Sequence, residues 1–318
     1  MKKLRLFVLI AVAWVHWHSN SIAQNKVSSE NKKTEEKEQK FSFGNISPVI
    51  LAQNRMEATA LSDLTSYWVL NKYGNNLLDR YRISRSENYI NASYGFSKNR
   101  RWDLGAQLRY SRLRIDETAR NSPFKVFAGT DSSGTSYTGL SGVGLRLRTQ
   151  PFESIPELTI QGSVNFPLIK NIETKSFLSA DRIQTDLVTT FYKSIDDSWY
   201  LYLQGRYILQ LANKDNNKTS HFPGISAYMV KSMFDHKAFL FPGISYIGSY
   251  QQNYKGGRLI RQAQFIMVSI GLQVQPSNQF SIFINGQRPF YHKSSASFYS
   301  DLVRNSYSDW AIGVRFVL

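Results

Sequence analysis

Apolar and polar residues alternate along most of the chain after residue 57. In Trp102–Arg112, WDLGAQLRYSR, every second residue from Trp102 to Tyr110 is apolar, and the residues between them are polar or glycine. A period of two places these two sets on opposite faces of an extended chain, so the segment is predicted to be a β-strand. The same alternation recurs in Glu157–Leu168, in Trp199–Leu211 and over Trp310–Leu318.

The same pattern predicts eight further strands, which brings the expected number to about twelve. An even number of strands is typical of single-chain bacterial transmembrane barrels. Twelve strands enclose more room than their side chains can fill, so the inward face is expected to be wet and polar. The further strands are expected near residues 58–70, 87–97, 135–149, 182–193, 221–231, 239–252, 260–275 and 280–291.

The connections between these strands alternate strictly between short and long. A membrane barrel has tight periplasmic turns at one end and long extracellular loops at the other, whereas a β-sandwich has no reason to sort its loops in this way. Residues 57–318 are therefore predicted to form an all-β, antiparallel, up-and-down transmembrane β-barrel with both termini periplasmic. The short connections are 98–101, 151–156, 195–198, 233–238 and 276–279; the long ones are 71–86, 115–134, 169–181, 213–220, 254–259 and 293–306.

Residues 1–23 have the three parts of an export signal peptide. Lys2, Lys3 and Arg5 precede an apolar stretch that is too short to span a bilayer, and Ser21-Ile22-Ala23 forms a small-x-small cleavage site. We expect export through the Sec pathway and cleavage after Ala23.

Two further segments separate the signal peptide from the barrel. Residues 24–40 are rich in both charges and contain no aromatic residue, which is typical of a disordered tether. Residues 41–56, FSFGNISPVILAQNRM, are too apolar for a tether. They are expected to form either a plug inside the barrel or an extra edge element.

Composition narrows the class of protein further. The chain has 39 Lys plus Arg against 23 Asp plus Glu, and an exported basic protein is expected to meet anionic lipid, lipopolysaccharide or small solutes rather than nucleic acid. The absence of cysteine excludes disulfides, thiolate metal sites and a cysteine nucleophile. Mean hydropathy is −0.35 and no long apolar run follows the signal peptide, which excludes a helical membrane protein.

The C-terminal segment YSDWAIGVRFVL, together with the export signal and the strand pattern, resembles the outer-membrane β-barrel proteins of Gram-negative bacteria. The resemblance implies location in the outer membrane and insertion by the barrel-assembly machinery, which reads an alternating final strand closing on an aromatic residue. Here Phe316 lies two residues before the terminal Leu318. YGFSKNRRWDLGAQLRY and ELTIQGSVNFPL are also similar to the outer-membrane transporters grouped with phenol-degradation MetA-like proteins. The assembly-signal residues would be Trp310, Ile312, Val314, Phe316 and Leu318.

The strand pattern places several charged residues on the inward face, as candidates for lining a pore. A ring of arginines in a narrow pore favours anions. The alternative interpretation, favoured for the individual residues, is that Arg and Asp pair across strands and brace the lumen. The function expected from this pattern is a channel or transporter for passive or facilitated passage of a small polar or anionic solute. The candidates are Arg109, Arg146, Arg148, Arg206 and Arg315, with Asp103, Asp186 and Asp309.

Two other classes of function stay open. A structural or surface-binding, adhesin-like barrel would use long loops such as 115–134, which can fold inward as a constriction or outward as a contact surface. An outer-membrane hydrolase would need a rim site built from His292 with Ser294, Ser295 or Asp301, although no spacing specific to such a site is present. No enzyme activity, metal or cofactor is expected, and the oligomeric state cannot be derived from the sequence.

Overall fold

The computed structural model describes residues 50–70, 80–98, 101–128, 131, 133–214, 216–253, 257–294 and 306–318. The predicted signal peptide, the predicted tether and residues 41–49 lie outside the described residues. Within the part of the chain that is described, no helix is both long enough and apolar enough to cross a membrane.

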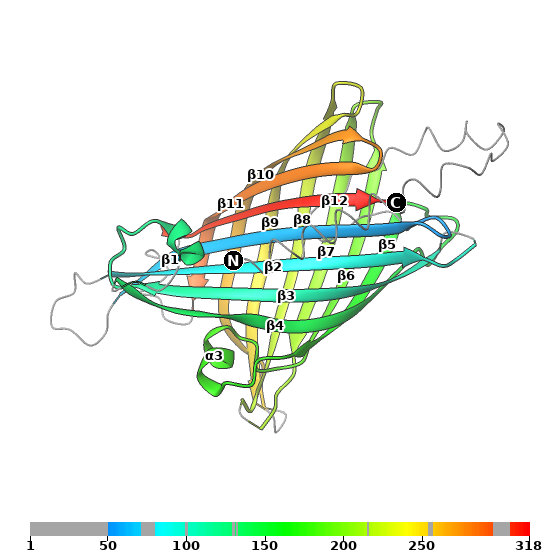
Figure 1. Ribbon diagram of the computed structural model, residues 1–318. Helices are drawn as coiled ribbons and strands as arrows, with labels where there is room; N and C mark the ends of the chain where they lie inside the picture. Colours follow the sequence, from blue (N-terminus) through cyan, green and yellow to red (C-terminus); the bar gives the residue numbers. More distant parts are fainter. Residues whose placement is uncertain are drawn as a thin grey trace. The chain divides into compact units, whose positions relative to one another are not determined.

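Twelve strands make up most of the described chain, with one short 3-10 helix and one short α-helix in the connections (Figure 1). The elements are β1 (Met56–Leu70), β2 (Arg80–Gly95), β3 (Trp102–Asp116), η1 (Pro123–Phe127), β4 (Gly134–Thr149), β5 (Leu158–Pro167), α3 (Ile172–Phe177), β6 (Gln184–Ser194), β7 (Trp199–Gln210), β8 (Lys218–Met233), β9 (Ala238–Asn253), β10 (Ile260–Ser277), β11 (Phe280–Ser294) and β12 (Ser308–Val317).

The strands form one closed antiparallel barrel in which each strand pairs with its neighbours in sequence. β12 returns to β1, with Glu57 opposite Val317 and Ser66 opposite Ser308. The seam is extended by Met56 N–H to Leu318 O at 3.0 Å and Leu318 N–H to Met56 O at 2.8 Å. The prediction of a twelve-stranded up-and-down barrel is thereby confirmed.

The second strand begins earlier than its sequence pattern predicts. β2 starts at Arg80 instead of near residue 87, because β1 and β2 stay paired as far as Leu70 opposite Arg80. The segment RYRISRS, residues 80–86, is polar at most positions of both faces, so its pattern does not separate two faces and predicts a loop over 71–86. Backbone pairing between β1 and β2 does not depend on side-chain polarity, so it continues beyond the residues in which apolar and polar side chains alternate.

Short and long connections alternate around the barrel as predicted, which defines a short-turn end and a long-loop end. The turn between β6 and β7 illustrates how the short ones are built. Asp196 Oδ1 accepts hydrogen bonds from the backbone N–H groups of Ser198 at 2.7 Å and Trp199 at 2.8 Å. These donors lower the pKa of the Asp196 carboxyl, and they fix the turn in the manner of other Asx turns.

The two faces of the barrel wall differ sharply in composition. Apolar side chains stand exposed on the outside: Leu145 is 60% exposed, Ile225 62% and Ile270 60%. The inward positions of the same strands carry polar residues such as Arg146, Ser226 and Ser269. This arrangement is the reverse of a soluble barrel and is typical of a lipid-facing one.

The lumen is filled near the short-turn end, which corrects the expectation of a wet interior along its whole length. On β7–β9, Tyr202, Tyr228, Val230, Phe239 and Phe241 form a buried cluster. Every strand contributes a buried inward side chain at this end, and we call this set, with the cluster, the packed layer. One member from each strand in order is Glu57, Ser93, Asp103, Arg148, Thr159, Thr190, Tyr202, Val230, Phe241, Gln273, Ser281 and Arg315.

Inward glycines make room for the aromatic rings of the packed layer. A Cβ at Gly271 on β10 would overlap the ring of Phe241 on β9. A Cβ at Gly243 would likewise overlap the ring of Tyr228. Each ring therefore lies flat against the neighbouring strand, which is possible only where that strand has no side chain.

Gly271→Ala is expected to lower the free energy of unfolding by about 1–3 kcal/mol, because the added methyl overpacks a fixed ring. Gly205→Ala is the matched control, since a Cβ there meets nothing within 4 Å and faces outward. The control is expected to change stability by less than about 1 kcal/mol. Urea unfolding of the refolded variants measures both. Equal losses in the two variants would contradict the packing argument.

Candidate functional site

A cavity of about 260 Å³ lies in the lumen. Tyr228 belongs to both the cavity wall and the aromatic cluster, so the cavity lies directly against the packed layer. Its wall is largely polar and charged, and it is contributed by strands on all sides of the barrel. The charged residues that line it are Asp63, Arg109, Arg146, Asp186 and Arg206, and the amide side chains are those of Gln107, Gln161, Asn165, Gln184, Gln204, Asn285 and Gln287.

The predicted pore-lining arginines divide between two places. Arg109, Arg146 and Arg206 line the cavity. Arg148 and Arg315 lie in the packed layer, where Arg148 is fully buried. The structure therefore does not bring the five together as one ring around an open pore.

Arg148 is the centre of a buried ion cluster in the packed layer. Its Nε lies 2.9 Å and 3.0 Å from the two carboxylate oxygens of Asp103, and its Nη2 lies 3.4 Å from Glu57 Oε1. Glu57 also accepts a hydrogen bond from Arg315 Nε at 2.8 Å. A buried guanidinium that is held by two carboxylates braces strands β1, β3 and β4, in keeping with the cross-strand ladder expected from the sequence.

The segment before β1 reaches the same cluster. Leu51 is buried, and its backbone N–H donates to Asp103 Oδ2 at 3.2 Å. Asn54 N–H donates to Gly95 O at 2.8 Å, which ties the segment to the end of β2. Residues 50–55 thus add to the packed layer, and the rest of the predicted plug or edge element lies outside the described residues.

The arginines at the cavity are also paired. Arg206 Nε lies 3.1 Å from both oxygens of Asp186, and its Nη2 lies 2.5 Å from Asp186 Oδ2. Arg109 Nη2 and Arg85 Nη2 each lie 2.5 Å from Glu87 Oε1. Bidentate and shared pairs of this kind hold guanidinium groups firmly against one wall.

Asp309 and Asp63 behave differently, because neither forms an ion pair among the described residues. Asp309 Oδ1 accepts from Thr65 Oγ1 at 3.4 Å, and its Oδ2 accepts from Gln287 Nε2 at 2.5 Å. Asp63 lines the cavity, and its Oδ1 has no hydrogen-bond partner in the described part of the chain.

Inward arginines and inward carboxylates are therefore balanced in number on the described strands. The excess of basic residues in the composition does not appear in the lumen. Sequence analysis missed four of these residues, all on β1 and β2, where the alternation is loose or polar on both faces. The arginines are Arg85, Arg109, Arg146, Arg148, Arg206 and Arg315; the carboxylates are Glu57, Asp63, Glu87, Asp103, Asp186 and Asp309.

At the long-loop end, the connection between β5 and β6 folds into the barrel. Leu178, just after α3, is fully buried and packs against the inward Leu113. Arg85 Nη2 donates to Leu178 O at 2.7 Å, and the rings of Phe177 and Tyr137 stack at 4.2 Å. This connection, which sequence analysis did not single out, narrows the mouth of the barrel.

The connection between β3 and β4, for which an inward and an outward course were both open, lies against the outer surface. Arg82 belongs to the outward set of β2, which includes Ile90 at 61% exposed. Its Nε and Nη2 donate to Ala119 O at 3.1 Å and 2.7 Å. η1 in the same connection packs against β2 and β3. The described residues of this connection that contact β2 and β3 therefore lie outside the lumen.

The histidines show no catalytic arrangement in the part of the chain that is described. The His292 ring is buried and stacks on Phe265 at 4.4 Å, while Ser295 and Asp301 lie outside the described residues. His221 Nδ1 lies 2.6 Å from Tyr207 OH, and His236 Nδ1 lies 2.7 Å from Ser232 Oγ. No three His, Asp or Glu residues among those described are placed to hold a metal ion.

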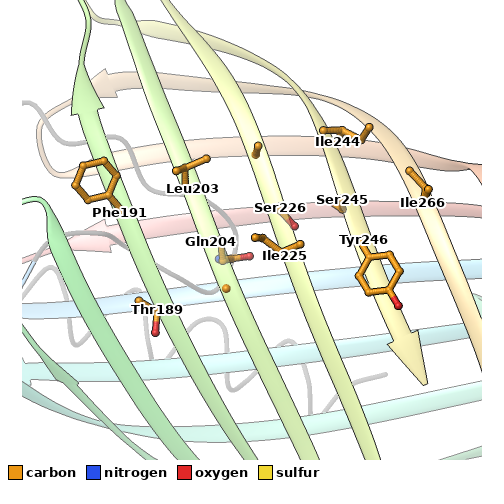
Figure 2. A pocket seen from close by; sticks show the side chains of 12 residues that line it. Thr189, Phe191, Leu203, Gln204, Ile225, Ser226, Ile244, Ser245, Tyr246 and Ile266 are labelled. Carbon is orange, nitrogen blue, oxygen red and sulfur yellow. The ribbon is translucent and has the colours of Figure 1, made fainter. Parts of the chain in front are cut away.

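A second hollow, of about 400 Å³, lies on the outer surface across β6–β10 (Figure 2). Its side chains are mostly apolar, with Phe191, Leu203, Ile225 and Ile244 among them. Gly205 lies in its floor. Because this hollow faces away from the lumen, it is not part of the candidate solute site.

Comparison with known proteins supports the fold. No protein-family model matches the chain, and no curated protein matches it. Among solved structures it is similar to the COG4313 outer membrane channel from Pseudomonas putida F1, with 12% identity, 87% of this chain and 98% of that chain covered, and a TM-score of 0.57. The beta domain of the Bordetella autotransporter BrkA is also similar, with 10% identity, 84% and 100% coverage, and a TM-score of 0.48.

The first of these similarities establishes the fold of an outer-membrane β-barrel and nothing finer. The resemblance to such barrels that the sequence indicated is thereby confirmed at the level of fold. The likeness to the MetA-like transporters is not tested by these findings and stays a prediction.

Proposed function

We propose that the chain is an outer-membrane barrel that allows small polar solutes to pass through its lumen, with both termini on the periplasmic side. The observation that carries the proposal is a polar, charged cavity of about 260 Å³ inside a closed barrel with an apolar outer surface. A polar interior behind a lipid-facing wall is the arrangement found in membrane channels.

The volume of the cavity limits the size of the solute. Drug-sized ligands occupy pockets of roughly 300–1,000 Å³. A cavity of about 260 Å³ is smaller than that range, so the solutes considered are those with only a few non-hydrogen atoms. This supports passage of small metabolites rather than oligosaccharides or peptides.

Passage requires movement in the packed layer. Tyr202, Phe241 and Arg148 are all fully buried at the short-turn end, so none of these side chains borders open lumen in this conformation. Side-chain displacement must accompany each passage event. We therefore propose a slow, gated channel rather than a permanently open pore.

Ion selectivity is proposed to be weak towards anions, because each inward arginine has a carboxylate partner. A guanidinium that is neutralised by a neighbouring carboxylate adds little field at the pore centre. The expectation of an anionic solute, drawn from the number of arginines alone, is accordingly replaced by a proposal of polar solutes without net negative charge.

The final strand supports insertion by the barrel-assembly machinery and contact with outer-membrane lipid. Trp310 and Ile312 are 51% and 53% exposed on the outer face of β12, and Phe316 is 41% exposed. These residues present an aromatic and aliphatic stripe to the lipid beside the seam with β1.

Liposome swelling with the refolded chain tests the proposed function. We expect swelling in ethylene glycol and glycerol at a rate well above that of protein-free liposomes, and no swelling in a tetrasaccharide, because the cavity is too small for it. Heat-modifiable mobility on electrophoresis serves as the folding control. A folded barrel that gives no swelling in either small solute would contradict the proposal.

A further inference from the structure

Two of the six inward carboxylates have no arginine partner in the described structure. Glu57, Glu87, Asp103 and Asp186 each form at least one ion pair. Asp63 and Asp309 form none among the described residues. The charges that are not neutralised by an ion pair in the lumen are therefore negative, although the chain as a whole is basic.

These two residues share one wall, formed by β1, β12 and β11. Asp63 lies opposite Ala311 in the β1–β12 register, and Ala311 lies opposite Asn285 in the β11–β12 register. All three residues line the cavity, and because Ala311 carries only a methyl group, we call the position between Asp63 and Asn285 the recess. Asp309 precedes Ala311 by two residues on the same face, which makes it a diagonal neighbour of Asp63 across the β1–β12 pair.

Two acceptor atoms beside this recess have no donor in the described part of the chain. Asp63 Oδ1 and Asn285 Oδ1 are buried and have no hydrogen-bond partner in the described part of the chain. Asn285 lines the cavity and is only 8% exposed, so bulk solvent does not satisfy its carbonyl oxygen. Buried acceptors are normally satisfied, which indicates that a donor-rich group occupies the recess when the site is in use.

The neighbouring carboxyl groups of Asp63 and Asp309 also favour a cationic ligand. Two carboxylates that are diagonal neighbours on one face of a sheet repel each other unless a proton or a cation is shared between them. The guanidinium groups that act on Asp63 are those of Arg206 and Arg109, which are already bonded to Asp186 and Glu87. A cationic group supplied by a solute would relieve the repulsion.

We propose that this recess, the amine site, binds the primary ammonium group of a small polar solute through Asp63, Asp309 and Asn285. An ammonium group offers three N–H donors and no acceptor, which matches a recess that offers only acceptors. A divalent metal such as Ca²⁺ would need six to eight oxygen ligands. The inference rests on the proposed function, because it names the chemical class of solute that enters the cavity.

Three probes of matched size test the amine site: ethanolamine, which is protonated at neutral pH, ethylene glycol, which is neutral, and glycolate, which is anionic. Isothermal titration with the refolded, detergent-solubilised chain measures binding directly, without requiring passage. Ethanolamine is expected to bind at least about tenfold more tightly than ethylene glycol, in line with a charge-assisted hydrogen bond, and glycolate to bind most weakly.

Variants locate the site. Asp63→Asn and Asp309→Asn are each expected to reduce ethanolamine affinity about tenfold, while Asn285→Asp is expected to raise it. Asp196→Asn, in the β6–β7 turn, makes the same change in charge outside the lumen and is expected to have no effect. The gain with Asn285→Asp cannot arise from misfolding. Equal binding of all three probes, or an equal loss with Asp196→Asn, would overturn the proposal, and so would equal competition by sodium chloride.

The two proposals fail separately. If the chain binds ethanolamine but supports no swelling, the amine site stands and the channel function is wrong. If neutral solutes swell liposomes while ethanolamine shows no preference, the channel function stands and the amine site is wrong.

Discussion

An Arg148→Met substitution is expected to lower the free energy of unfolding by about 3–5 kcal/mol. Arg148 is fully buried and is held by Asp103 and Glu57. Its removal leaves the Asp103 carboxylate in the packed layer without the guanidinium that is bonded to it, and that poorly compensated charge, more than the lost attraction, is the source of the cost. Equilibrium unfolding in urea, followed by tryptophan fluorescence, measures the change.

Arg206→Met is the matched control for this prediction. Arg206 is also paired with a carboxylate, but its side chain is 44% exposed to the cavity. Water can solvate the Asp186 carboxylate once the guanidinium is removed, so the free energy of unfolding is expected to fall by less than about 1 kcal/mol. In the double variant Arg148→Met/Asp103→Leu, removal of both charges should recover much of the stability. Equal losses for Arg148→Met and Arg206→Met would show that burial of the ion cluster is not what matters.

Phe241→Ala is expected to raise the single-channel conductance of the refolded chain by at least several-fold. The ring is fully buried and fills the space over Gly271, where the lumen would otherwise be open. Removal of the ring leaves a gap in the packed layer next to the cavity, through which water and ions can enter. Planar-bilayer recording under symmetric salt measures the conductance.

Phe191→Ala removes the same ring from the outer hollow and serves as the control, with no change in conductance expected. Both variants need to show heat-modifiable mobility, because Phe→Ala at a packed position costs about 3–5 kcal/mol. Tyr202→Ala, which opens the same layer from β7, is a second test if Phe241→Ala does not fold. Unchanged conductance in the folded variants would show that the packed layer is not the gate.

Most strands could be predicted from the sequence because apolar and polar residues alternate wherever the outer and inner faces of a strand differ in polarity. The strand predicted over Trp102–Arg112 forms β3, which begins at the same residue and extends to Asp116. β1 gave a weaker signal, since its outward set includes Ser62 and Ser66 while its inward set includes Leu61. Glu57 and Asp63 were missed for that reason: neither stands out in a strand whose two faces have similar polarity.

The closure of the lumen could not be predicted, because it depends on contacts across the barrel. Tyr202 appears in sequence simply as one more residue on the polar face of its strand. Its burial requires Phe241 and Gly271, and their positions follow from a register that alternation does not encode. The same limit applies to the arginines: a period of two places Arg148 inward, but only the β3–β4 register brings it opposite Asp103.

The Glu57–Arg315 pair also bears on how the barrel is assembled. The two residues are 258 positions apart, yet their side chains meet at 2.8 Å across the seam between β1 and β12. Contacts of such high sequence separation form late, since the loop they close includes nearly the whole barrel. While β12 is still undocked, the cations that remain beside Glu57 among the described residues are Arg146 and Arg148 on β4. The arrival of Arg315 therefore coincides with ring closure, so this ion pair can serve as a reporter that distinguishes an open sheet from a finished barrel.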